Sequence, residues 1–98
     1  MHARVSHVTG SAENADQGIE SFKNTTLPQL KSIDGNRGGI LLIDRTSGRA
    51  MAITLWDSEA AMQASDDRAN QMRREASEQM GGGGEARVER YEVAVFET

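Results

Sequence analysis

Two apolar runs joined by a short polar connection constrain the fold of this chain more than any other feature. The runs cover residues 39–43 and 50–56, and the connection between them ends at Gly48. The tripeptide Thr46-Ser47-Gly48 is typical of a type I turn followed by a residue with positive φ, which glycine adopts without steric cost. The pattern therefore predicts an antiparallel β-hairpin in which Arg45 faces Arg49.

The predicted turn also determines which residues share a face of the hairpin. In this register Ile43 lies opposite Met51, and side chains alternate between the two faces with a period of two. One face then carries Leu41, Ile43, Met51, Ile53 and Leu55, and the other carries Ile40, Leu42, Ala50, Ala52, Thr54 and Trp56. A sheet wetted on one side alternates apolar and polar residues, and neither face here does so. We expect helices of this chain to cover the first face, and a second subunit or a ligand to cover the second.

The composition indicates one small domain with a thin core. The chain has 98 residues, of which 37% are hydrophobic, and its aromatic residues are two Phe, one Tyr and one Trp. A core of this size usually gains stability by oligomerisation. We therefore expect a single domain over residues 1–98 that pairs with itself as a homodimer.

Charge and hydropathy argue against several classes of partner. The net charge is −4, with acidic and basic residues interspersed, whereas a general nucleic-acid binder needs a basic stripe. No apolar run approaches the length of a membrane span or of a signal peptide. We expect a cytoplasmic protein that binds neither nucleic acid nor membrane. The chain has no cysteine, which removes thiolate chemistry.

The first third of the chain predicts a strand, a helix and a turn. Residues 2–9 alternate loosely and indicate a strand, after which Ser11 is a plausible helix N-cap. An apolar helix face follows at steps of three and four residues as far as Ile33. Pro28 removes a backbone donor within this face, so we expect a kink or break at residues 24–27. Residues 34–36, Asp-Gly-Asn, predict a turn before the hairpin.

A second helix and a last strand are predicted after Trp56. Asp57 or Ser58 can cap this helix, and a run of four glycines at 81–84 ends it and links it to a strand over residues 85–97. The helix has a stripe of small and flexible side chains that we expect to be buried, namely Ala61, Ser65, Ala69, Met72, Ala76 and Met80. The resulting βαββαβ order predicts an α+β, ferredoxin-like fold, with a four-stranded antiparallel sheet and two helices on one face. A second copy packed on the other face would make a dimeric α+β barrel.

These elements resemble the dimeric α+β barrel superfamily, and in particular its antibiotic-biosynthesis-monooxygenase-like (ABM-like) domains. The resemblance covers nearly the whole chain and includes the βαββαβ order, the hairpin and the stretch from Pro28 to Gly35. Its most specific motif is Trp-Asp-Ser-Glu-Ala-Ala at 56–61, and the closing Val-Glu-Arg-Tyr-Glu-Val-Ala-Val strand also matches. The resemblance implies a homodimer with a mostly apolar cavity by the dimer interface. It further implies cofactor-independent oxygenation of a small aromatic or quinol-type molecule.

Residues for such a pocket can be named from the predicted strand faces. Trp56 is the candidate wall against a flat ligand, opposite Gly38, although it can equally pack the dimer interior. The other candidate lining residues are Thr54, Ser6, Ile40 and Leu42. A substrate anion needs a cationic or hydrogen-bonding partner, for which the candidates are Arg4, Arg90 and His7. Arg90 can instead form an arginine–carboxylate pair across the dimer.

The sequence offers little to a metal ion or to haem. His2 and His7 lie five residues apart on one strand and so face opposite sides, and we expect neither a metal site nor a cofactor. Haem-degrading relatives carry a histidine in the second helix, where this chain has Ala64-Ser65-Asp66-Asp67. That difference argues against haem degradation.

Two functions remain open from the sequence. The first is the cofactor-free monooxygenase implied by the resemblance. The second is a non-catalytic small-molecule-binding or stress-related dimer, which is favoured because no catalytic constellation is evident.

Overall fold

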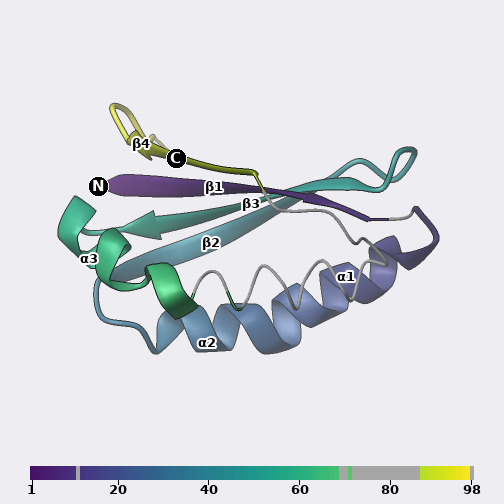
Figure 1. The fold of residues 1–98 in the computed structure, drawn as a ribbon, viewed down its shortest axis with the longest axis horizontal. Coiled ribbons are helices and arrows are strands. Elements are labelled where there is room, and N and C mark those ends of the chain that lie inside the picture. The colour runs from purple at the N-terminus through teal and green to yellow at the C-terminus, as the bar shows by residue number, and fades with distance from the viewer. Residues whose placement is uncertain (11, 69–70, 72–86, 98) are drawn as a thin grey trace.

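The protein folds as a four-stranded antiparallel sheet with its helices on one face (Figure 1). The computed structural model describes residues 1–10, 12–68, 71 and 87–97. The strands lie in the order β2-β3-β1-β4, which confirms the α+β, ferredoxin-like prediction. Their bounds are β1 His2–Thr9, β2 Asn36–Ile43, β3 Arg49–Trp56 and β4 Arg87–Glu92, and the helices are α1 Ala15–Ser21, α2 Leu27–Lys31 and α3 Glu59–Ala64.

The predicted break before Pro28 is a π-helical stretch. A 3-10 turn, Ala12–Asn14, leads into α1, and Phe22–Thr26 then widens into π-helix before α2 begins at Leu27. The Leu27 N–H donates to the Phe22 carbonyl, five residues back. Proline cannot donate the next backbone hydrogen bond, and a π turn is one way in which a helix re-pairs its carbonyls around such a gap. Regular α-helix is therefore interrupted in the predicted region, and the helical path continues through it.

Ser58 is the residue that caps α3. Its backbone is extended, and its Oγ accepts a hydrogen bond from the Ala61 N–H at 3.1 Å, as an N-cap serine does. Of the predicted buried stripe, Ser65 is buried and Ala61 packs against the core. Ser11, the rest of that stripe and the glycine run at 81–84 lie outside the described residues.

The hairpin connection differs from the predicted one by a single residue. The Asp44 N–H donates to the Arg49 carbonyl and the Gly48 N–H donates to the Asp44 carbonyl, both at 2.8 Å, so the loop has four residues, 45–48. The Asp44 carboxylate accepts from the backbone N–H of Thr46 at 2.9 Å and of Ser47 at 3.4 Å. This Asx-type turn draws Arg45 into the loop and makes Asp44 the partner of Arg49.

The one-residue difference exchanges the faces of β2, so the predicted register is wrong. Leu42 pairs with Met51 and Ile43 with Ala50, and Trp56 lies opposite Asn36 and not Gly38. A slip of one residue moves every side chain of a strand to the other face. Leu41 and Ile43 therefore share a face with Ala50, Ala52, Thr54 and Trp56, while Ile40 and Leu42 share the other with Met51, Ile53 and Leu55.

The core lies between the helices and the Trp56 face of the sheet, which we had expected to serve a partner or ligand. Leu30, Trp56 and Met62 form its largest cluster, with Leu27, Ile33 and Ala61 packed around them. The opposite face, here called the open face, carries apolar side chains that stay exposed: Ile40 is 40% exposed and Leu42 is 50% exposed. An exposed apolar sheet face of this kind is typical of an interaction surface.

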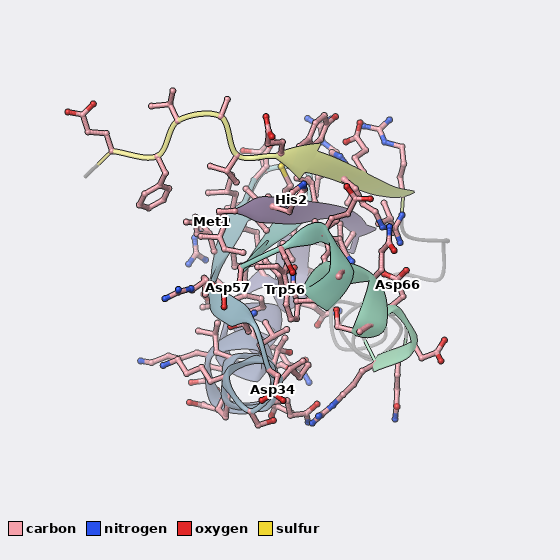
Figure 2. The ribbon with its side chains drawn as sticks, turned by 90° about the vertical axis from the view of Figure 1, so that its left-hand side faces the viewer. Met1, His2, Asp34, Trp56, Asp57 and Asp66 are labelled. Atoms are coloured by element: carbon pink, nitrogen blue, oxygen red, sulfur yellow. The ribbon has the colours of Figure 1, made fainter. Side chains whose placement is uncertain are left out.

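The last strand is shorter than predicted. Hydrogen-bonded pairing with β1 ends at Glu92, and the Val93 N–H then donates to the Met1 carbonyl at 2.9 Å. Residues 93–97 continue as extended chain beyond the sheet (Figure 2). Val95 is 81% exposed and Phe96 is 56% exposed there. No helix among the described residues is long and apolar enough to cross a membrane.

Candidate functional site

A buried arginine lies at the centre of the helix-covered face. Arg4 of β1 is 1% exposed and pairs with Thr54 on one side and Arg90 on the other, so all three side chains point toward the helices. Its Nη2 donates to the Met62 carbonyl at the end of α3 and to Ser65 Oγ, the latter at 3.0 Å. These contacts join the middle of the sheet to the end of α3.

The same guanidinium lies over the indole of Trp56, with Arg4 Cζ 5.5 Å from the ring centroid, which is cation–π distance. Trp56 is fully buried, and its Nε1 donates to Thr54 Oγ1 at 2.9 Å (Figure 2 shows its position beside α3). Arg4 Nε and Nη1 are buried and have no hydrogen-bond partner among the residues that the structure describes. Buried polar groups are normally paired, so these two nitrogens indicate hydrogen-bonding capacity that is not yet used.

Asp66 joins Arg4 to Arg90. One carboxylate oxygen, Oδ1, accepts from Arg4 Nη2 at 2.6 Å and from Arg90 Nη2 at 3.0 Å. The Asp66 side chain is 35% exposed and that of Arg90 is 42% exposed, so the cluster runs from the core to the surface. We call Arg4, Asp66 and Arg90 the arginine clasp. Its formal charge is +1, from two guanidinium groups and one carboxylate.

Burial and charge act in opposite directions within the clasp. Burial lowers the pKa of Arg4 below its ordinary value, although the charge of Asp66 acts against that shift. Burial also raises the pKa of Asp66, but the hydrogen bond from Arg90 and the charge of Arg4 outweigh it and leave that pKa below its usual range. Asp66 is therefore a carboxylate at neutral pH, and the clasp keeps its single positive charge.

A cleft of about 490 Å³ lies beside the clasp, where the first residue of β1 meets β4 and α3. Its lining consists of His2, Glu59, Met62, Gln63, Arg90, Tyr91 and Glu92. His2 Nε2 lies 3.7 Å from Glu59 Oε2, and His2 Nδ1 is buried without a hydrogen-bond partner among the described residues. A mixed polar and apolar cleft of this volume is large enough for a small organic molecule.

Comparison with solved structures shows which known fold this architecture has. The chain superposes on a monooxygenase from the gene ActVA-Orf6 of Streptomyces coelicolor, in complex with nanaomycin D, with a TM-score of 0.75 at 14% identity, covering 99% of this chain and 92% of that one. It also superposes on the haem-degrading protein MhuD (Rv3592) of Mycobacterium tuberculosis, with two haems in its active site. There the TM-score is 0.71 at 16% identity, covering 100% of both chains. The chain has the ABM-like fold.

Sequence relatives are found in Mycobacterium tuberculosis. The chain is 39% identical over 79 residues to the uncharacterised protein Rv2557. This match covers 81% of the present chain and 35% of Rv2557. It is 35% identical over 96 residues to the uncharacterised protein Rv2558, covering 98% of this chain and 40% of that protein. The chain thus spans 35% of the length of Rv2557 and 40% of that of Rv2558. No protein-family model matches it.

The structure separates the predicted pocket residues into two groups. Arg4, Ser6, Thr54 and Trp56 share the helix-covered face of the ABM-like fold, whereas Ile40 and Leu42 lie on the open face. Ser6 is 5% exposed and Trp56 is fully buried. Trp56 therefore packs in the core of its own chain, between the sheet and the helices, and does not point toward a partner across the open face.

His7 lies on the open face, apart from the other two candidate anion partners. Its Nε2 is 2.6 Å from Glu89 Oε1 and 3.3 Å from Arg87 Nη2, and Tyr91 donates to Glu89 Oε2 at 2.9 Å. Hydrogen bonds from His7 and Tyr91 lower the pKa of Glu89, and the hydrogen bond with Glu89 raises the pKa of Tyr91. The structure thus brings Arg4 and Arg90 together and leaves His7 in a separate polar cluster.

Sequence reasoning missed Asp66, His2 and Glu59. Asp66 was considered only as part of the stretch that lacks the histidine of haem-degrading relatives, and His2 only as half of a metal pair. The usable indication was Arg4 itself, because an arginine on a buried strand face needs a carboxylate partner. Among the described residues, no group of three or more His, Asp or Glu side chains is arranged to hold a metal ion.

Proposed function

We propose that this protein is a cofactor-independent monooxygenase that binds a small flat phenol or quinol in the cleft beside Arg90. One observation carries the proposal: two arginines on one sheet face share a single carboxylate oxygen next to a cleft of about 490 Å³. The likeness of fold to the Streptomyces coelicolor monooxygenase supports it. Such chemistry needs a site that stabilises a substrate anion, and a clasp of net positive charge can do that.

Anthrone, whose enol tautomer is a flat phenol, illustrates the step. Loss of a proton gives an electron-rich anion, and its carbon forms a bond to O₂ to give, after protonation, a hydroperoxide. Loss of water then breaks the O–O bond and the remaining C–H bond at that carbon, which leaves a carbonyl. One anthrone and one O₂ thus give one anthraquinone and one water, and the substrate supplies all the electrons.

The residues of the cleft suit two parts of this step. Arg90 lies in the lining and can hold the substrate oxyanion, with Arg4 adding positive charge behind it. His2 lies in the same lining, with its Nε2 3.7 Å from Glu59 Oε2, and an imidazole at this place can take up the substrate proton.

We also propose that the protein works as a homodimer formed through the open face. The exposed Ile40, Leu42 and Tyr91 of this face support a second copy as its occupant, because a self-complementary apolar face closes as a two-fold dimer. The thin core of the chain makes such burial a sizeable part of its stability.

Oxygen uptake with anthrone tests the proposal. The purified protein should consume O₂ and form anthraquinone in equal amounts, at a rate proportional to protein concentration. Arg90→Gln should reduce kcat/KM by about tenfold or more, as loss of a charged hydrogen bond does. Arg45→Gln is the matched control, because Arg45 is an exposed arginine paired with Asp16 at the far side of the molecule, and it should keep full activity.

A second function is favoured by the burial of Trp56. Its ring is fully buried against Leu30 and Met62, so the space behind the cleft is packed. A protein that only binds a small molecule does not need an enclosed reaction cavity there. Saturable binding of anthrone without O₂ uptake would support this function and reject the monooxygenase. Haem degradation is not proposed, because Asp66 of the clasp occupies the stretch where haem-degrading relatives carry histidine.

A further inference from the structure

We infer that Asp66 occupies the place of a ligand carboxylate, and that the ligand of the cleft is an aromatic carboxylate which displaces Asp66 from the two arginines. The inference rests on the cleft assigned under the proposed function and specifies the class of molecule that enters it. It follows from the geometry of the clasp, from the distribution of charge along the cleft and from the position of Asp66 in the chain.

The clasp is only partly satisfied by Asp66. A single oxygen of this residue accepts from both guanidinium groups, at 2.6 Å from Arg4 Nη2 and at 3.0 Å from Arg90 Nη2. Arginine binds a carboxylate best through two parallel N–H···O hydrogen bonds, one to each oxygen. A ligand carboxylate, which is not tied to the backbone of this chain, can give one oxygen to Arg4 Nη2 and the other to Arg90.

Charge along the cleft is segregated. Arg90 lies at one end, with its register partner Arg4 buried behind it, and Glu92 and His2 are register partners two residues further along the same strands. Glu59 lies near His2, so the second end carries two carboxylates. The lining therefore suits a molecule whose carboxylate takes the oxyanion place at Arg90, with a ring between the two ends and, at the other end, a hydroxyl whose proton His2 can take up.

Asp66 can leave the clasp without loss of the remaining contacts. It lies two residues beyond the end of α3, and its side chain is 35% exposed, so it can turn toward water. Ser65 Oγ still donates to the Met62 carbonyl at 2.7 Å, and Arg4 still donates to both of these groups. The buried guanidinium thus stays anchored to α3 while Nη2 exchanges one carboxylate for another.

Calorimetric titration with 6-hydroxy-2-naphthoate and its neutral carboxamide tests the inference. In the wild-type protein the carboxylate should bind at least about tenfold more tightly than the carboxamide, the ratio expected of one charge-assisted hydrogen bond. Asp66→Asn removes the competing charge, so the carboxylate should bind about tenfold more tightly than to wild type. The carboxamide should change by less than twofold, because it does not compete for the clasp.

The direction of the Asp66→Asn effect decides the outcome. A residue that only supports the site would weaken binding when changed, so equal or weaker carboxylate binding overturns the inference. An equal gain for both ligands overturns it too, since that would reflect a more open cleft. Asp66→Ser, with far-ultraviolet circular dichroism to confirm folding, gives a second variant of the same expected direction. Asp67→Asn, an exposed neighbour, is the control and should leave both affinities unchanged.

Anthrone turnover separates this inference from the proposed function. Anthrone carries no carboxylate. If the wild-type protein oxidises anthrone but binds the naphthoate no more tightly than its carboxamide, the inference alone is overturned. Tight naphthoate binding with the expected Asp66→Asn gain, but no O₂ uptake with anthrone or the naphthoate, would overturn the monooxygenase alone.

Discussion

The free energy of unfolding should respond very differently to loss of Asp66 and to loss of the buried Arg4. Arg4 is 1% exposed and is held by Asp66, Ser65 and the Met62 carbonyl. Asp66→Ala leaves this buried cation without an acidic partner among the described residues. Arg4→Met, in contrast, removes the cation and fills most of its volume with an apolar chain that can pack against Trp56.

The magnitudes follow from the contacts. Breaking a buried ion pair by removing one partner costs about 3–5 kcal/mol of folding free energy. Asp66 is partly exposed, so its loss should cost less, about 2–3 kcal/mol. Replacing the buried arginine by methionine also relieves the burial of Nε and Nη1, which have no described partner. Ser65 keeps its bond to the Met62 carbonyl, so Arg4→Met should change the free energy of unfolding by no more than about 1 kcal/mol.

Urea unfolding followed by far-ultraviolet circular dichroism measures these values for both single variants and for the double variant. In the Arg4→Met background, Asp66→Ala should cost less than about 1 kcal/mol, which gives a coupling of roughly 2 kcal/mol between the two residues. The reasoning is refuted if Arg4→Met destabilises the protein more than Asp66→Ala does. It is also refuted if the two changes are additive, because the acid would then not depend on the buried base.

Three further results are expected. Gly35 has φ of 84°, and a Cβ there would lie 2.6 Å from the Ala61 Cβ. Gly35→Ala should therefore lower the free energy of unfolding in urea by about 1–3 kcal/mol. Adding Ala61→Gly should recover the part of this cost due to the steric clash but not the part due to positive φ. Light scattering should show that Leu42→Lys on the open face converts a dimer to a monomer while Val95→Lys does not; equal behaviour of the two would reject the open face as the interface. Hydrogen bonds from two backbone N–H groups of the turn lower the pKa of Asp44, so its stabilising effect is present above the unfolded pKa, about 3.9, and is lost as pH falls through the folded value. Urea midpoints from neutral to acid pH should therefore fall more for wild type than for Asp44→Asn, and parallel curves would contradict this assignment.

The architecture could be predicted from the sequence because local signals of several kinds agreed. The alternation at residues 2–9, the proline-broken helix and the capped helix start after Trp56 each involve neighbouring residues only. Their order alone implies the ferredoxin-like topology, and the strand order β2-β3-β1-β4 is the one observed. Features of this kind depend on chain geometry and not on distant partners.

The register of the hairpin could not be predicted by the same means. The three-residue turn at Thr46–Gly48 and the observed four-residue turn are close alternatives, and the Asp44 carboxylate favours the second by accepting two backbone N–H groups. Both faces of the hairpin are apolar, so no polar residue opposes the one-residue slip. An error of one residue in the loop was therefore enough to place Ile40 and Leu42 on the wrong face.

Arg4 shows where sequence reasoning about the site ends. Its place on one face with Thr54 and Trp56 follows from the two-residue period of β1 and β3 and was predicted. That face was expected to serve a partner or ligand, and the helices cover it instead. A buried guanidinium requires an acidic partner, but the stretch after α3 offers two adjacent acids, and which of them turns inward depends on where α3 ends at Ala64. The structure assigns that place to Asp66, with one oxygen shared by two arginines and two nitrogens of Arg4 unpartnered among the described residues. A carboxylate that binds from the cleft can give one oxygen to each arginine, so the sharing of a single Asp66 oxygen is the reason to expect that another anion can replace it.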